Sequence, residues 1–211
     1  MMRFSVWRTR RMLDQNSQPL TDPSITRLAD RMAAAMGIPE IKVRVFEVEP
    51  VNGLAAPDGR IFLTRGFLNR KAQGEVTAEE LASVIAHEMG HVAQGHMRRR
   101  MIDFTGQNAV FVMLSALLNR FLPFIGIWIA NLISTALMAR LSRRDEFEAD
   151  AWASALLIKS GIGTGPQKSL FRKLEALTQN RAEGVPAWLL SHPHVEERIA
   201  AIEANEARWV G

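Results

Sequence analysis

The first part of the chain shows two hydrophobic patterns that predict different elements. Apolar residues recur along 23–36 at the spacing of one helix face, and Asp22-Pro23 supplies a helix start. Gly37 follows as a stop signal. Residues 41–45 then alternate between apolar and polar, which predicts a half-buried strand.

Two more strands are expected directly after this one. They should cover about 51–56 and 60–64, separated by a turn at Pro57-Asp58-Gly59. Proline presets φ in such a turn and glycine tolerates positive φ. Together the three strands predict a small antiparallel sheet.

The rest of the chain is predominantly helical in pattern. Thr77 and Glu80 have the spacing of a capping box at the start of a helix that continues through His91. Three further helices are expected, at about 143–159, 166–180 and 193–207. The fold class is therefore α+β and mainly helical, with the small antiparallel sheet beside the 77–91 helix.

The sequence His87-Glu88-Met89-Gly90-His91 carries the clearest chemical signal. Positions i and i+4 share one face of a helix, so both imidazoles can bind one metal ion. Glu88 lies one step round the helix, where it can take a proton from a water molecule whose pKa a zinc ion lowers. The pattern predicts a zinc site for peptide hydrolysis, with one Zn²⁺ per chain.

A catalytic zinc needs a third protein ligand. His96 is five residues beyond His91 and falls off the same helix face. The metzincin pattern also fails, because Gln94 and Met97 stand where that class has glycine and a third histidine.

Glu146 is the remaining strong candidate for the third ligand. It is four residues before Asp150 on an expected helix, so Asp150 can hydrogen-bond the far nitrogen of a ligand histidine, expected to be His87. This spacing favours Glu146 over Glu148 as the ligand.

Residues 109–139 are strongly apolar and have more than one interpretation. They can form buried helices that cover the active-site domain, or a hairpin that dips into a membrane surface. A single membrane crossing would separate the histidine pair from Glu146, and the stretch is short for two crossings. Arginines at 98–100 and 140–144 flank it and suit an anionic membrane face.

Composition limits the remaining possibilities. The 211 residues fit one domain with appendages, and we divide them into a basic segment 1–22 and a metallopeptidase domain 23–211 with an apolar helical insertion at about 104–140. The absence of cysteine excludes disulfides and thiolate ligands. The net charge is +4, but no nucleic-acid motif accompanies the basic residues, so no nucleic acid is expected as a partner.

The chain resembles the HtpX-like and CAAX-prenyl-peptidase-type gluzincin zinc metallopeptidases. The resemblance covers about residues 23–205 and rests on several motifs in order: Asn52-Gly53-Leu54-Ala55 with 57–66, the zinc helix at 87–91, Ser142–Asp150, and Ser191-His192-Pro193-His194 running to Arg198.

The resemblance implies a zincin-like catalytic domain and endopeptidase activity in quality control of unfolded or membrane-proximal proteins. It implies that an extended substrate adds to the sheet edge at Asn52, Gly53, Leu54 and Ala55. Members that span membranes have apolar segments before the zinc helix. None precedes residue 77 here, which argues against a prenyl-peptidase role.

The resemblance also places His192 and Arg198 near the zinc. His192 can donate to the oxyanion of the tetrahedral intermediate, or bind zinc as a removable fourth ligand. Alternatively it caps the last helix ahead of Pro193.

The leading hypothesis is a zinc metalloendopeptidase with polypeptide substrates. The N-terminus has no run of seven apolar residues, so no signal peptide is predicted and an intracellular site, cytoplasmic or at the membrane face, is expected. The alternative is a non-catalytic zinc protein that binds peptides or membranes.

Overall fold

The structure of the chain is a computed structural model. It describes residues 11–56, 58–96, 111–120, 125–179, 186–192 and 194–210. Pro57 of the predicted turn, Arg98–Arg100 and Pro193 lie outside these residues. Gly59 has the positive φ, 84°, that the turn requires.

The sheet has four short strands: β1 (Ser17–Pro19), β2 (Val43–Phe46), β3 (Gly53–Ala55) and β4 (Ile61–Thr64). Their order is β1-β2-β4-β3, so β3 is an edge strand. β1 was not predicted, because we treated residues 1–22 as a basic segment and expected no strand there. It pairs with β2 and brings part of the N-terminal segment into the fold.

The expectation of a wholly antiparallel sheet was wrong. β2 and β4 are parallel, while β1–β2 and β3–β4 are antiparallel. The reason is the connection after β2, which passes the end of β4 before β3 begins. Arg65 binds Glu47 of this connection through both carboxylate oxygens, at 2.9 and 2.7 Å. A Cβ on Gly66 would lie 1.9 Å from the Glu49 carbonyl oxygen, so the connection passes only because that residue is glycine.

The predicted helices are confirmed. α2 (Pro23–Met36) starts at the Asp22 cap, and α4 (Ala78–Ala93) starts with both hydrogen bonds of the predicted capping box. α7 (Gly165–Gln179) and α9 (Val195–Val210) lie where helices were expected. The short helices α3 (Arg65–Ala72) and α8 (Ala187–Ser191) were not predicted, and neither was the helical turn at residues 11–15.

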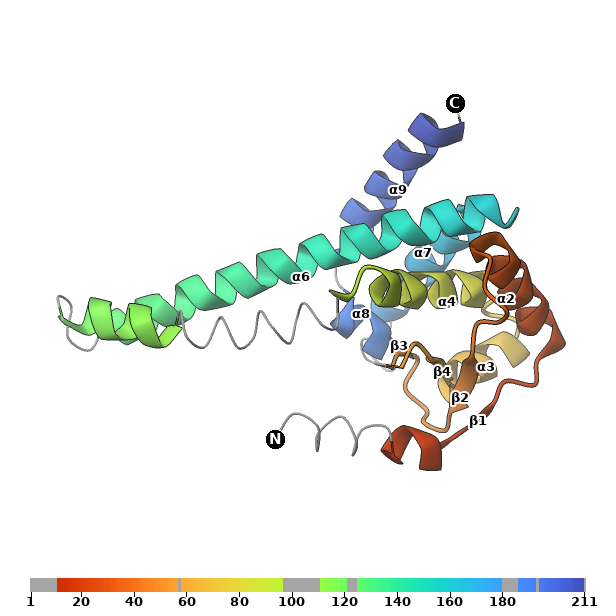
Figure 1. The fold of residues 1–211 in the computed structure, drawn as a ribbon, viewed down its shortest axis with the longest axis horizontal. Helices are drawn as coiled ribbons and strands as arrows, with labels where there is room; N and C mark the ends of the chain where they lie inside the picture. Colours follow the sequence, from red (N-terminus) through yellow and green to blue (C-terminus); the bar gives the residue numbers. More distant parts are fainter. Residues whose placement is uncertain are drawn as a thin grey trace.

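α4 is the central element of the core. Every residue from Glu80 to His91 is buried. The helix contacts α2, α6, α7 and the strands β3 and β4, as Figure 1 shows. The helices and strands packed around α4 thus exclude water from the predicted metal ligands.

The helix expected at 143–159 is the second half of a much longer one, α6 (Gly126–Lys159, 34 residues). Its first half and the helical residues 111–120 extend well beyond the rest of the protein (Figure 1). We call residues 111–120 and 125–139 the apolar arm. Its large exposed side chains are Val112, Met113, Leu117, Ile125, Ile127, Trp128, Leu132, Ile133 and Leu137.

One interpretation of the sequence was that this stretch forms buried helices that cover the active-site domain. The apolar arm does not cover that domain. Ala130 and Ser134 are buried within the arm, but the nine large apolar side chains named above are exposed. No helix in the described part of the chain is both long and apolar enough to cross a bilayer.

Candidate metal centre

α4 and α6 cross closely enough for ligands from both helices to meet. A Cβ on Gly90 would lie 2.8 Å from the carbonyl oxygen and 3.1 Å from the Cα of Ala149. These are backbone atoms, so no side chain can move aside. Gly90 thus lets the α6 backbone approach the histidine face of α4. Glu146 lies about one helical turn before Ala149 on α6, so its carboxylate is brought to the same face.

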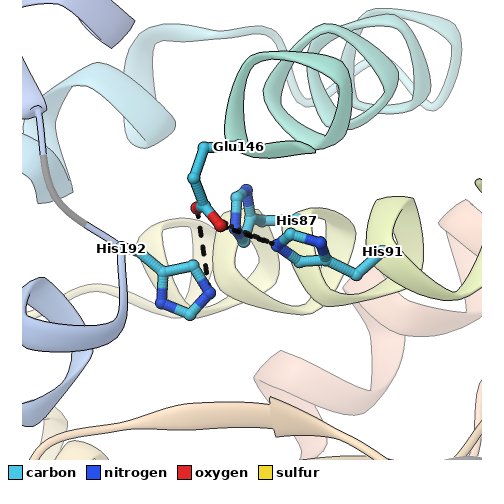
Figure 2. Close-up of side chains that lie close together, drawn as sticks. All are labelled: His87, His91, Glu146 and His192. Atoms are coloured by element: carbon cyan, nitrogen blue, oxygen red, sulfur yellow. Dashed lines mark hydrogen bonds and ion pairs between the residues drawn. The ribbon is translucent and has the colours of Figure 1, made fainter. Parts of the chain in front are cut away.

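The predicted ligand atoms converge. The Nε2 atoms of His87 and His91 are 3.1 Å apart, and they lie 3.4 and 3.5 Å from the two carboxylate oxygens of Glu146. Figure 2 shows Glu146 reaching from α6 toward the two imidazoles on α4. Ligands at zinc distances in a tetrahedron are separated by about 3.3 Å. All three side chains are buried, so the donor set and its spacing fit a zinc ion.

Asp150 lies beside His87, on the side away from the other ligands. Its Oδ1 is 2.9 Å from His87 Nδ1. Arg198 binds both oxygens of Asp150, at 2.5 and 2.8 Å. Burial alone would raise the pKa of Asp150, but Arg198 and the His87 hydrogen bond lower it to about 2. Asp150 is therefore a carboxylate that can accept the Nδ1 proton of His87 and leave Nε2 for a metal.

The charges of the centre are set by the same groups. Without a metal, burial lowers the pKa of His87, but hydrogen bonds with Asp150 and Glu146 outweigh it and raise this pKa to about 9. Burial likewise opposes ionisation of Glu146, yet the hydrogen bond with His87 and the charge of Arg198 hold its pKa well below the usual range. A metal ion bound here takes the place of the imidazolium proton between these carboxylates.

Arg198 is completely buried. Its guanidinium stacks over the rings of Phe171 and Trp188, at 4.5 and 5.1 Å from their centroids. It also donates to the His192 carbonyl oxygen. Arg198 thus joins α9 to α6 and α8 and holds the carboxylate that contacts His87.

His192 lies beside the three predicted ligands. Its side chain is within 4.8 Å of the three predicted ligands as a possible fourth donor (Figure 2). Its Nδ1 is 3.1 Å from the Trp188 carbonyl oxygen, and its ring stacks on the Trp188 ring. His192 follows the end of α8, whereas α9 begins only at Val195, so it does not cap the last helix.

Glu88 lies close to both β3 and His192. Its Oε1 is 3.7 Å from His192 Nε2. A Cβ on Gly53 would also lie 3.7 Å from this oxygen, and only 2.4 Å from Val84. Gly53 therefore lets the edge strand lie against α4 beside the predicted base.

Three groups in this region were missed from the sequence. Trp188 gave no signal because α8 is too short for a periodic pattern. Gln167 donates to Asp150 from α7, and no motif indicated it. His96 was dismissed as a ligand, but it contacts His91.

Comparison with known proteins agrees with the geometry. The sequence pattern of peptidase family M48 matches residues 19–206. The chain belongs to this family. It is therefore a metalloprotease, and the buried cluster of two histidines and Glu146 is its candidate metal centre.

Named relatives of this M48 peptidase are proteases. The metalloprotease LoiP of Escherichia coli is 28% identical over 84% of this chain and 70% of its own length. A protease HtpX homolog of Variovorax paradoxus is 26% identical over 93% of this chain and 77% of its length. Protease HtpX of Pseudomonas aeruginosa is 27% identical over 90% of this chain and 75% of its own length.

The close crossing at Gly90 can be tested directly. Gly90→Ala should lower the free energy of unfolding by about 1–3 kcal/mol, because the added methyl overlaps the α6 backbone. Without that overlap, alanine would be the better helix former by about 1 kcal/mol. Denaturant unfolding of the metal-free protein measures the change.

Gly165→Ala is the matched control. Gly165 is also helical, but nothing lies within 4 Å of its Cβ position, so stability should hold or rise slightly. Equal stability of Gly90→Ala and the wild type would contradict the argument.

Proposed function

We propose that this M48 peptidase is a zinc-dependent endopeptidase, with His87, His91 and Glu146 as ligands and Glu88 as the general base. The observation that carries the proposal is the convergence of the three ligand side chains at tetrahedral spacing beside a buried Glu88. Zinc held there would lower the pKa of a water molecule and polarise the scissile carbonyl.

The chain's own residues then supply the proton transfers. Glu88 takes a proton from the attacking water, and the water oxygen adds to the carbonyl carbon. The carbon–nitrogen bond breaks as Glu88 returns that proton to the leaving amine. Asp150 keeps the proton of His87 on Nδ1 throughout, and Arg198 keeps Asp150 ionised.

The function is tested by Glu88→Gln. Glutamine keeps the shape and leaves the three ligands in place, but it cannot take a proton. Cleavage of unfolded casein should fall by about 10²–10⁴-fold, while the metal content stays at that of the wild type. Unchanged hydrolysis would rule out Glu88 as the base. A wild-type protein that retains zinc but cleaves no unfolded substrate would favour the non-catalytic alternative.

For His192 we propose the role of a removable fourth ligand. Burial lowers its pKa to about 3, so the ring is neutral. Its one proton lies on Nδ1, toward the Trp188 carbonyl oxygen, which leaves a lone pair on Nε2. An Nε2 without a proton can bind a metal but cannot donate to an oxyanion. Substrate would displace it.

We propose that the polypeptide substrate pairs with the free edge of β3. Asn52 and Ala56 bond to β4, since Thr64 donates to the Asn52 carbonyl and Ala56 donates to the Arg60 carbonyl. Backbone groups alternate in direction along a strand, so those of Gly53 and Ala55 face away from β4. This edge lies beside Glu88, as an extended substrate requires.

Ala55→Pro tests the substrate edge. Proline removes the N–H that faces away from β4 and is tolerated on edge strands. The kcat/KM for a long unfolded peptide should fall about 3–10-fold, the effect of one hydrogen bond. Ala55→Ser keeps the N–H and should behave as wild type. An unchanged kcat/KM in Ala55→Pro would place the substrate elsewhere.

We further propose that the apolar arm binds an anionic membrane surface, such as the cytoplasmic face, and that the substrates are unfolded or membrane-proximal proteins. Trp128 and Leu132 are 74% and 69% exposed, on a helix with apolar residues around most of its surface. Such a helix is stable when an apolar phase covers it. Exposed arginines at 120, 140 and 143 can contact lipid phosphates.

Vesicle sedimentation tests the membrane contact. The wild type should bind phosphatidylcholine vesicles that contain phosphatidylglycerol, and less so in high salt. The double variant Trp128→Gln/Leu132→Gln should bind roughly tenfold or more weakly, from the apolar area lost. Trp209→Gln changes an exposed tryptophan outside the apolar arm and should have no effect. Equal binding by all three proteins would contradict the contact.

A further inference from the structure

His96 lies directly behind the metal ligand His91. α4 ends at Ala93, and Gly95 turns the chain with φ of 65°. This turn brings the His96 ring back beside the helix, where it is only 1% exposed. The Nδ1 atoms of His91 and His96 are 2.8 Å apart, a hydrogen-bond distance.

The direction of this hydrogen bond follows from the metal site. His91 presents Nε2 to the other ligands, so its proton lies on Nδ1 whenever Nε2 binds a metal. His91 Nδ1–H must then donate to His96 Nδ1. The His96 proton is thereby placed on Nε2, where it needs an acceptor.

Glu148 supplies that acceptor. Its Oε2 is 3.2 Å from His96 Nε2, and its Oε1 accepts a hydrogen bond of 2.7 Å from Arg144. Asp145 lies near the same nitrogen at 3.8 Å. When His91 binds the metal, its Nδ1 proton is therefore accepted by His96, and the Nε2 proton of His96 is accepted by Glu148.

We propose that His96 is a positioning residue that orients His91 for metal binding through Nε2, with Glu148 fixing the tautomer of His96. Asp150 has the corresponding role for His87, because it accepts the Nδ1 proton of that ligand. α6 thus supplies one ligand, Glu146, and two further carboxylates, Asp150 beside His87 and Glu148 beside His96. The inference rests on the proposed function, because it needs His91 to be a ligand.

Three variants separate positioning from packing. His96→Asn keeps an acceptor oxygen close to the Nδ1 position. His96→Gln places its amide near the Nε2 position instead, and His96→Leu removes both polar atoms. Zinc affinity is measured by competition with a chelator, and the absorption spectrum of the cobalt-substituted protein reports ligand geometry. The melting temperature of the metal-free protein monitors folding.

His96→Leu and His96→Gln should bind zinc about 10–100-fold more weakly than the wild type. His96→Asn should stay within about 3-fold and keep the wild-type cobalt spectrum. Equally weakened zinc affinity in His96→Asn and His96→Gln, or wild-type zinc affinity in His96→Leu, would overturn the positioning role. If Leu does not fold, the comparison of Asn with Gln decides.

Metal stoichiometry separates this inference from two other outcomes. Two zinc ions per wild-type chain, with one lost in His96→Leu, would make His96, Asp145 and Glu148 a second metal site and overturn the positioning role. No zinc in the wild type would instead overturn the proposed function. One zinc in the wild type with unaltered affinity in all three variants would overturn the inference alone.

Discussion

The contact between the backbones of α4 and α6 at Gly90 and Ala149 is the constraint on which the centre depends. A tetrahedral metal allows ligand atoms only about 3.3 Å apart. The glutamate side chain is short, so its helix must approach the histidine helix almost to backbone contact. Gly90 permits that approach, and the observed separations of 3.4 and 3.5 Å between Glu146 and the two histidines result from it.

Such an approach buries several ionisable groups. The elements around the centre supply the opposite charges and hydrogen bonds that these groups need. Asp150 and Glu146 are both buried and both ionised, which would be unfavourable without cations nearby. Arg198 is the fixed cation, and its stacking on Phe171 and Trp188 holds it in an apolar environment. α8 and α9 are therefore part of the centre, although they supply none of the three predicted ligands.

The sequence predicted best what is local. The 77–91 helix, its capping box and the histidine spacing all depend on residues within a few turns, and the helix is confirmed. The pairing of β2 with β4 could not be deduced in this way. It depends on contacts of Arg65 with Glu47 and of Gly66 with Glu49, and no periodicity encodes these contacts.

The same limit explains what was missed at the centre. Glu146 and Asp150 could be related to His87 because a helix fixes their spacing. His96 was judged by continuing the α4 helix past its end, whereas Gly95 reverses the chain there. Trp188 and Gln167 reach the centre through the packing of α7 and α8, so single-sequence patterns carry no trace of them.

α6 links the centre to the apolar arm within one continuous helix. Trp128 and Glu146 are 18 residues apart in its sequence, which corresponds to about 27 Å along the axis. A helix transmits position over that distance because its backbone hydrogen bonds are unbroken. If the arm is held at a membrane surface, the centre is held with it, at a separation set by the helix rather than by a flexible linker. Segments of substrate that project from that surface would then be the ones within reach of β3 and Glu88.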